Sequence, residues 1–131
     1  MIKSANLFLS FNGNCKDALN FYKDTFDAKI IECVTYGEAE MASKDSETEL
    51  IMNSSIILGN LHISCTDNLN YDTISGNQTS IWLEIDNEEN FMEIYNKFND
   101  ILLKKEETFW NSIYAKVKDN FGVIWELNYQ K

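Results

Sequence analysis

The chain has 131 residues, a length typical of one domain, and its 44% hydrophobic content is too high for a disordered protein. Its 21 acidic residues against 11 basic ones give a formal net charge of −10. Because such a surface repels phosphate groups, the composition argues against nucleic acid and anionic membranes as partners.

The first half of the chain predicts a strand, a helix and three further strands. Residues 7–11 form the first strand, and a helix begins after Asn14, a residue type suited to the N-cap. The apolar stripe of this helix consists of Ala18, Leu19, Tyr22 and Phe26. Three strand-like runs follow at residues 29–36, 50–58 and 61–66. The uncharged stretch 50–66 is broken by polar residues and glycine, which indicates two strands and a turn rather than a membrane span.

The second half repeats this order after a polar loop at residues 67–78. A strand is predicted at 80–85, and the helix that follows from Asp86 begins with acidic residues, which suit the positive end of a helix. Its stripe consists of Phe91, Ile94, Tyr95 and Phe98. Strand-like runs then cover residues 104–109, 112–118 and 123–129. Between the last two runs, Asn120-Phe121-Gly122 predicts a hairpin turn with glycine at the unusual dihedral.

The predicted fold is therefore α+β, with two β-α-β-β-β modules at about 1–67 and 78–131 in a single domain, 1–131. Two short helices cannot cover both faces of eight strands, so one sheet face meets solvent, a ligand or another subunit. Strand alternation places apolar residues such as Ile81, Leu83, Trp125 and Leu127 under the helices. The opposite face is expected to hold Ser80, Trp82, Glu84, Tyr114, Ile124, Glu126 and Asn128. Alternation alone leaves open a plainly solvated face.

Two segments resemble the PhnB-like branch of the glyoxalase/bleomycin-resistance/dioxygenase superfamily, also called the vicinal oxygen chelate (VOC) superfamily. They are FNGNCKDALNFY at residues 11–22, and TFWNSIY at 108–114 followed by VKDNFGVIW at 117–125. The resemblance implies a curled eight-stranded mixed sheet around a concave cavity, and a homodimer. A ubiquinone-pathway methyltransferase label is common in this family, but the sequence has no glycine-rich strand-turn-helix for such a cofactor.

Many superfamily members hold a divalent metal with His and Glu side chains from the first and last strands of each module. The resemblance places these positions at Leu7, Ser64, Ser80 and Glu126, and a histidine common in the third strand falls at Asn53. Among the four positions, Glu126 is the one competent ligand, whereas transition-metal sites need three or four donors. We therefore expect no cofactor, and a divalent metal is disfavoured.

The candidate catalytic residues are Glu126 and His62. The alternatives are a structural carboxylate paired with Lys116 and a structural histidine. The candidate ligand-binding residues are Tyr36, Asn53, Trp82, Glu84, Phe109, Trp110, Tyr114 and Glu126. The aromatic members of this set are also compatible with a core or a dimer interface.

Three functions remain open. The first is a small-molecule-binding protein without a tightly held metal, whose ligand, for example a cation, lies between aromatic rings and Glu84/Glu126; the superfamily's drug-sequestering members supply the analogy. The second is a metal-dependent glyoxalase- or dioxygenase-like enzyme with lyase or isomerase chemistry. The third is a structural or regulatory dimer.

The three cysteines, Cys15, Cys33 and Cys65, cannot all pair within the chain and match no zinc motif, which is typical of reduced thiols. The first residues show no secretory pattern. We therefore expect a cytoplasmic protein.

Overall fold

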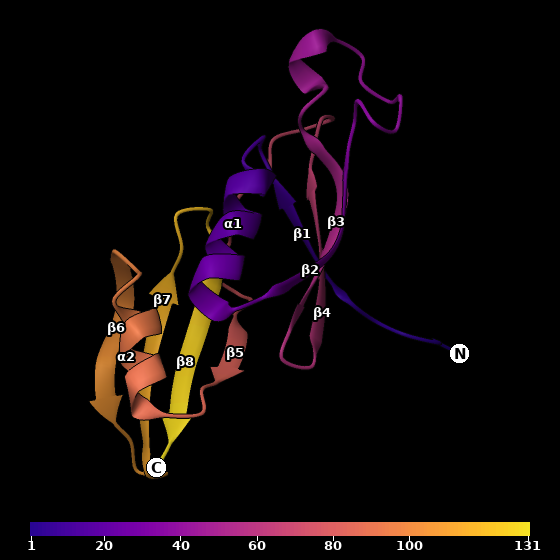
Figure 1. Ribbon diagram of the computed structural model, residues 1–131. Helices are drawn as coiled ribbons and strands as arrows, with labels where there is room; N and C mark the ends of the chain where they lie inside the picture. Colours follow the sequence, from indigo (N-terminus) through magenta and orange to yellow (C-terminus); the bar gives the residue numbers. More distant parts are fainter. The chain divides into compact units, whose positions relative to one another are not determined.

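The computed structural model describes residues 1–131, which divide into two compact units, Met1–Thr73 and Ile74–Lys131 (Figure 1). Both units have the order strand, helix and three strands, so the predicted α+β arrangement of two β-α-β-β-β modules is confirmed. The first unit contains β1 (Leu7–Phe11), α1 (Cys15–Phe26), β2 (Lys29–Thr35), the 3-10 turn η1 (Asp45–Glu47), β3 (Ile51–Leu58) and β4 (Leu61–Asp67). The second contains β5 (Ile81–Glu84), α2 (Glu88–Tyr95), β6 (Asp100–Glu107), β7 (Ser112–Lys118) and β8 (Ile124–Gln130).

The two units share one strand order. The eight strands form two mixed sheets of four, ordered β1-β4-β3-β2 and β5-β8-β7-β6. In each sheet the first strand pairs in parallel with the last strand of its unit, and the remaining pairs are antiparallel. Neither helix is long and apolar enough to cross a membrane.

In the first unit, α1 packs on β2, β3 and β4 with the predicted stripe inward. Ala18, Leu19 and Tyr22 are buried, whereas the fourth predicted member, Phe26, is half-buried. Helix α1 ends at Phe26, and the next residue, Asp27, adopts a left-handed conformation at φ 57°. The amphipathic pattern therefore predicted the inward face of this helix correctly for three of its four residues.

The start of α1 is held by a residue from the far end of the unit. Asn14 occupies the N-cap position as predicted, but its side chain makes no capping hydrogen bond. Instead, Oδ1 of Asp67 accepts hydrogen bonds from the backbone N–H groups of Gly13 (2.9 Å) and Cys15 (3.0 Å). Its Oδ2 accepts from the N–H of Ile51 (2.9 Å). One buried carboxylate thus joins β4, β3 and the beginning of the helix.

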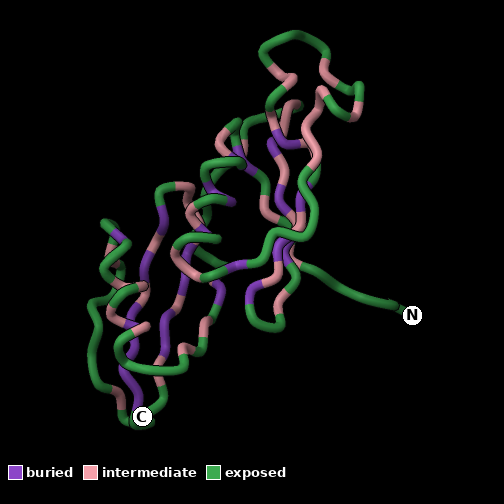
Figure 2. The backbone as a smooth tube through the Cα atoms, viewed as in Figure 1, coloured by how far each residue is buried: buried purple, intermediate pink, exposed green.

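In the second unit, α2 packs on β7 and β8, which carry most of the buried residues (Figure 2). Its N-cap is made locally, because the side chain of Asn87 accepts a hydrogen bond from the N–H of Asn90 (2.8 Å). Phe91 and Phe98 are buried as predicted, whereas Ile94 and Tyr95 of the same predicted stripe are half-buried. Along β7 and β8, the fully buried side chains Val117, Trp125 and Leu127 form the helix-facing layer.

The turn between β7 and β8 has the predicted hairpin form and is organised by Asp119. Oδ1 of Asp119 accepts from the N–H groups of Phe121 (2.9 Å) and Val123 (3.0 Å), and Oδ2 accepts from Nε1 of Trp125 (2.9 Å). Gly122 has φ 94°, and a Cβ there would lie 1.8 Å from Oγ of Ser75. Glycine is therefore required at this position by both conformation and space.

The largest boundary error concerns β6, predicted at 104–109 and observed at Asp100–Glu107. The strand starts earlier because it follows directly on Phe98, which anchors the end of the helical segment in the core. It ends before Phe109 because the N–H of Thr108 bonds the carbonyl of Ser112 (3.0 Å) and closes a turn. Asn111 in that turn has φ 61°, which no strand accommodates.

Candidate functional site

The open face of the second sheet, opposite α2, brings together most of the predicted ligand-binding residues. Strand pairing sets Trp82 beside Glu126 and Glu84 beside Asn128, and it sets Tyr114 on the other side of Asn128. The strand pairing therefore groups these side chains as expected, whereas Ile124, also expected on this face, is buried. We call this open face the acidic-aromatic face, and it consists of Ser80, Trp82, Glu84, Trp110, Tyr114, Glu126 and Asn128.

Glu126 is the centre of one hydrogen-bond group on this face. Its Oε2 accepts from the hydroxyl of Ser80 and its Oε1 from the hydroxyl of Tyr114, both at 2.5 Å. Lys116 lies opposite Glu126 in the β7–β8 pairing but makes no ion pair with it. Of the alternatives left open for Glu126, a direct ion pair with Lys116 is therefore not formed, and the hydroxyls of Ser80 and Tyr114 are the partners of the carboxylate.

These contacts set the protonation states of Glu126 and Tyr114. Burial acts to raise the pKa of the Glu126 carboxyl, but the hydrogen bonds from Ser80 and Tyr114, with the charge of Lys116, outweigh it and hold the pKa below its ordinary value of 4.5. Burial, the hydrogen bond to Glu126 and the nearby charges of Glu126 and Glu106 raise the pKa of the Tyr114 phenol well above 10.0. At neutral pH the site therefore holds a carboxylate and a protonated phenol.

Glu84 is the centre of a second group. Its Oε1 accepts from Nε1 of Trp82 (2.7 Å) and from Nδ2 of Asn128 (3.0 Å), and its Oε2 also accepts from Asn128 (3.2 Å). Asn128 is buried and also donates to Oγ of Ser112 (3.3 Å). As at Glu126, every donor in this group is neutral, and no cationic side chain forms an ion pair with the carboxylate.

Three aromatic side chains surround these carboxylates. The Trp82 ring stacks on Tyr114, with centroids 5.7 Å apart and planes at 23°. Trp110 meets Tyr114 edge-on, at 6.0 Å and 64°, and its Nε1 donates to Oδ1 of Asn128 (3.2 Å). Tyr114 is nearly buried, whereas Trp82 and Trp110 are 48% and 39% exposed. The indoles are therefore the aromatic surface that the site presents outward.

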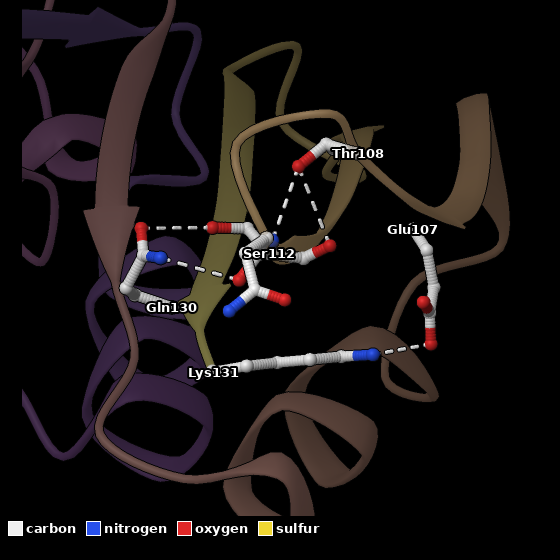
Figure 3. Close-up of polar contacts among 6 residues, drawn as sticks. Glu107, Thr108, Ser112, Gln130 and Lys131 are labelled. Atoms are coloured by element: carbon white, nitrogen blue, oxygen red, sulfur yellow. Dashed lines mark hydrogen bonds and ion pairs between the residues drawn. The ribbon is translucent and has the colours of Figure 1, made fainter.

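Trp110 lies in the β6–β7 turn, and the polar contacts around this turn are drawn in Figure 3. Oγ of Ser112 donates to Oε1 of Gln130 (3.1 Å), and Nε2 of Gln130 donates to the carbonyls of Trp110 (3.0 Å) and Asn111 (3.2 Å). Lys131 forms an ion pair with Glu107 beside this turn. Sequence reasoning missed Ser112 and Gln130 as supports, although Ser112 shares the alternation of Tyr114.

The remaining candidates are not members of these two hydrogen-bond groups. Phe109 is 97% exposed and touches the edge of Trp110, with centroids 5.0 Å apart. In the first unit, the hydroxyl of Tyr36 donates to the carbonyl of Asp67 (2.7 Å), which gives this tyrosine a structural contact. Asn53 in β3 and His62 in β4 are exposed and pair with Val34 and Ile57. Their roles as ligand-binding or catalytic residues stay predictions.

The four positions implied for a metal do not form a donor set. Leu7 pairs with the buried Ile63, which places it on the helix-covered side of its sheet, whereas its neighbour Phe8 is exposed and pairs with Ser64. Ser80 instead lies on the open face of the second sheet, where its hydroxyl donates a hydrogen bond to Glu126. Within either unit, no group of three or more His, Cys, Asp or Glu side chains converges. The residues present therefore do not fit a family-type metal centre.

This chain is similar in sequence to known proteins over nearly its whole length. The family model described as 3-demethylubiquinone-9 3-methyltransferase matches residues 3–128. Protein YjdN of Escherichia coli (strain K12) is 28% identical over 139 residues, covering 95% of this chain and 93% of YjdN.

Two solved structures are similar over nearly the whole chain. A PhnB protein from Bacillus cereus superimposes with a TM-score of 0.78 at 22% identity, covering 97% of this chain and 99% of that one. A glyoxylase/bleomycin resistance protein/dioxygenase domain from Frankia sp. EAN1pec has a TM-score of 0.69 at 10% identity, covering 100% and 93%. At these identities the matches establish the fold, and they confirm the fold class inferred from the sequence.

Proposed function

This chain belongs to the family described as 3-demethylubiquinone-9 3-methyltransferase, the PhnB-like family of the VOC superfamily, and we propose that it binds a small, positively charged molecule on the acidic-aromatic face. The observation that carries the proposal is that Glu84 and Glu126 are bonded by neutral donors alone and lie among exposed indole rings. We take the fold from the family membership, and not the methyl transfer that the family's description names.

Charge favours a cationic ligand over an anionic or neutral one. Glu84 and Glu126 lie on one sheet face, and Glu106 on β6 pairs with Tyr114 beside them. Together these carboxylates produce a negative potential that the single positive charge of Lys116 only partly offsets. A carboxylate on a plainly solvated sheet face would be hydrogen-bonded mainly by water and would be free to change its orientation. Here those donors hold each carboxylate in one orientation, so little ordering remains to be done when a cation arrives.

Replacing Glu126 by glutamine is expected to weaken binding of a cationic ligand by about tenfold while changing the free energy of unfolding by less than about 1 kcal/mol. Binding falls because the charge is lost, whereas the fold persists because the amide oxygen still accepts a hydrogen bond from Ser80 or Tyr114. Isothermal titration calorimetry with a panel of organic cations and urea unfolding provide the two measurements.

Glu93→Gln is the matched control, because Glu93 is an exposed carboxylate on α2, on the other side of the sheet. This variant should bind like the wild type. Since the pKa of Glu126 lies below 4.5, wild-type binding should hold at pH 5 and fall as the carboxyl protonates below pH 4.5. Equal binding by wild type and Glu126→Gln would remove Glu126 from the site.

We also propose that the protein works without a tightly held transition metal. The support is the donor set, in which Glu126 already accepts two hydroxyl hydrogen bonds and belongs to no group of three or more His, Cys, Asp or Glu side chains. Elemental analysis of protein purified without chelator should find zinc, nickel, manganese and iron each well below one per chain. A stoichiometric metal that disappears in Glu126→Ala would contradict this expectation.

A homodimer is proposed as the assembled state, in the cytoplasm. Large apolar side chains such as Phe8, Ile31 and Leu103 are about half exposed on the strands, which is typical of surfaces that another subunit covers. The three free cysteines suit a reducing compartment. Light scattering at micromolar concentration should give twice the 15.2 kDa of one chain, and a mass of one chain would reject the dimer.

A further inference from the structure

We propose, on the premise of the cation-binding face above, that the ligand's charge is carried by a quaternary, N-methylated ammonium group rather than by a primary amine. The inference rests on which groups of the acidic-aromatic face remain available to a ligand once the internal hydrogen bonds are made.

Both indole N–H groups of this face are used within the protein. Nε1 of Trp82 donates to Glu84 (2.7 Å), and Nε1 of Trp110 donates to Asn128 (3.2 Å). An indole whose N–H is engaged offers a ligand its ring surface only, and that surface attracts cations through the ring's quadrupole. Since Trp82 is 48% and Trp110 39% exposed, much of this ring surface is accessible.

The rings of Trp82 and Trp110 lie in different planes. Trp82 lies at 23° to Tyr114 and Trp110 lies at 64° to the same ring, so the indole planes cannot be parallel to each other. A group with methyls pointing in several directions has apolar surface to place against either ring plane. A primary ammonium on a flexible stem has no comparable apolar surface to place there.

The carboxylates offer charge but few free acceptor sites. Each oxygen of Glu126 already accepts a 2.5 Å hydrogen bond, and both oxygens of Glu84 accept from Asn128, with Trp82 as a second donor to Oε1. A primary ammonium is strongly hydrated and has three N–H donors to satisfy when it leaves water. A quaternary ammonium has none, so it gains the electrostatic attraction without that cost.

The test measures binding of three matched probes to the wild-type protein by calorimetry: choline, ethanolamine and 3,3-dimethylbutan-1-ol, the neutral isostere of choline. We expect choline to bind about tenfold more tightly than ethanolamine and more tightly than the neutral alcohol by a similar factor. Trp82→Leu should weaken choline binding by about tenfold, Trp82→Phe should retain most of it, and both variants should melt near the wild-type temperature.

The outcomes separate this inference from its premise. If ethanolamine binds as tightly as choline, the quaternary class is overturned while the cation site stands. If the neutral alcohol binds as tightly as choline, or if no probe binds, the cation-binding function and the inference both fail. If Trp82→Leu leaves choline binding unchanged, the aromatic contact is overturned, and the equivalent change at Tyr95, on α2, provides the control for loss of an aromatic elsewhere in the unit.

Discussion

Replacing Asp67 by asparagine is expected to lower the free energy of unfolding by about 3–5 kcal/mol, a large fraction of the total for a domain of this size. The buried carboxylate accepts three backbone N–H groups, and hydrogen bonds to a charged acceptor are each worth roughly 1.5–3 kcal/mol. Asparagine keeps one acceptor oxygen for Gly13 and Cys15. Its amide N–H₂, however, faces the N–H of Ile51, so one donor is left unsatisfied in the core.

Urea unfolding at neutral pH, followed by far-UV circular dichroism, measures this loss. Asp72→Asn is the matched control, because Asp72 is an exposed aspartate in the loop that follows β4. The control should unfold within about 0.5 kcal/mol of the wild type. A loss below about 1 kcal/mol in Asp67→Asn would mean that the helix start does not depend on this carboxylate.

Replacing Asp119 by alanine is expected to cost about 3–4 kcal/mol of unfolding free energy in the second unit. The change removes the acceptor for the N–H groups of Phe121 and Val123 and for the indole of Trp125. Trp125 is fully buried under α2, so its indole N–H has no access to water as a substitute. Thermal unfolding should show a lower Tm by several degrees.

The variant Asp119→Asn separates the stability contributed by the turn hydrogen bonds from the stability contributed by the hydrogen bond to the Trp125 indole. The asparagine oxygen continues to accept from the turn, but its amide group meets the Trp125 N–H as donor against donor. We expect this variant to lose more than half of the stability that Asp119→Ala loses. Asn120→Ala, at an exposed position of the same turn, serves as the control and should be nearly neutral. A neutral Asp119→Asn would show that the indole bond contributes little.

Sequence alternation was enough to find the acidic-aromatic face, because the side-chain period of a strand is a local property. Trp82, Glu84 and Glu126 occur at alternate positions whose neighbours are apolar, so their common face could be predicted before the pairing was known. The partners of Glu126 could not, since the choice between Lys116 and the hydroxyls of Ser80 and Tyr114 depends on side-chain conformations across three strands.

The comparison of the two modules failed at the first strand for a physical reason. The resemblance makes Leu7 and Ser80 the equivalent first-strand positions of the two modules, yet Leu7 lies on the helix-covered face of its sheet and Ser80 on the open face of the other. The connection into α1 passes through Gly13 at φ 94°, and the connection into α2 has no residue with positive φ. Leu7 lies eight positions before the start of α1, whereas the inward-facing Ile81 lies seven positions before the start of α2, so the alternation differs by one between the modules.

The hydrogen bonds by which Asp67 holds the start of α1 could not be predicted from the sequence either. Its donors Gly13 and Cys15 lie more than fifty positions away along the chain, and an aspartate at the start of a polar segment is ordinarily a loop residue. Asp119 gave a stronger local signal, because an aspartate two residues before the donor N–H of a turn is a common turn former.

The parallel pairing of the first and last strand in each unit has a consequence for the order of folding. β2, β3 and β4 are joined by antiparallel neighbours close in sequence, whereas Leu7 meets Ile63 only after the rest of the unit has been enclosed. The same holds for Ile81 and Trp125. Closing these long loops carries the largest entropic cost, so the three-strand meanders should form first and β1 and β5 dock last. Because the chain contains no proline, a slow refolding phase in this protein would report that docking step and not peptide-bond isomerisation.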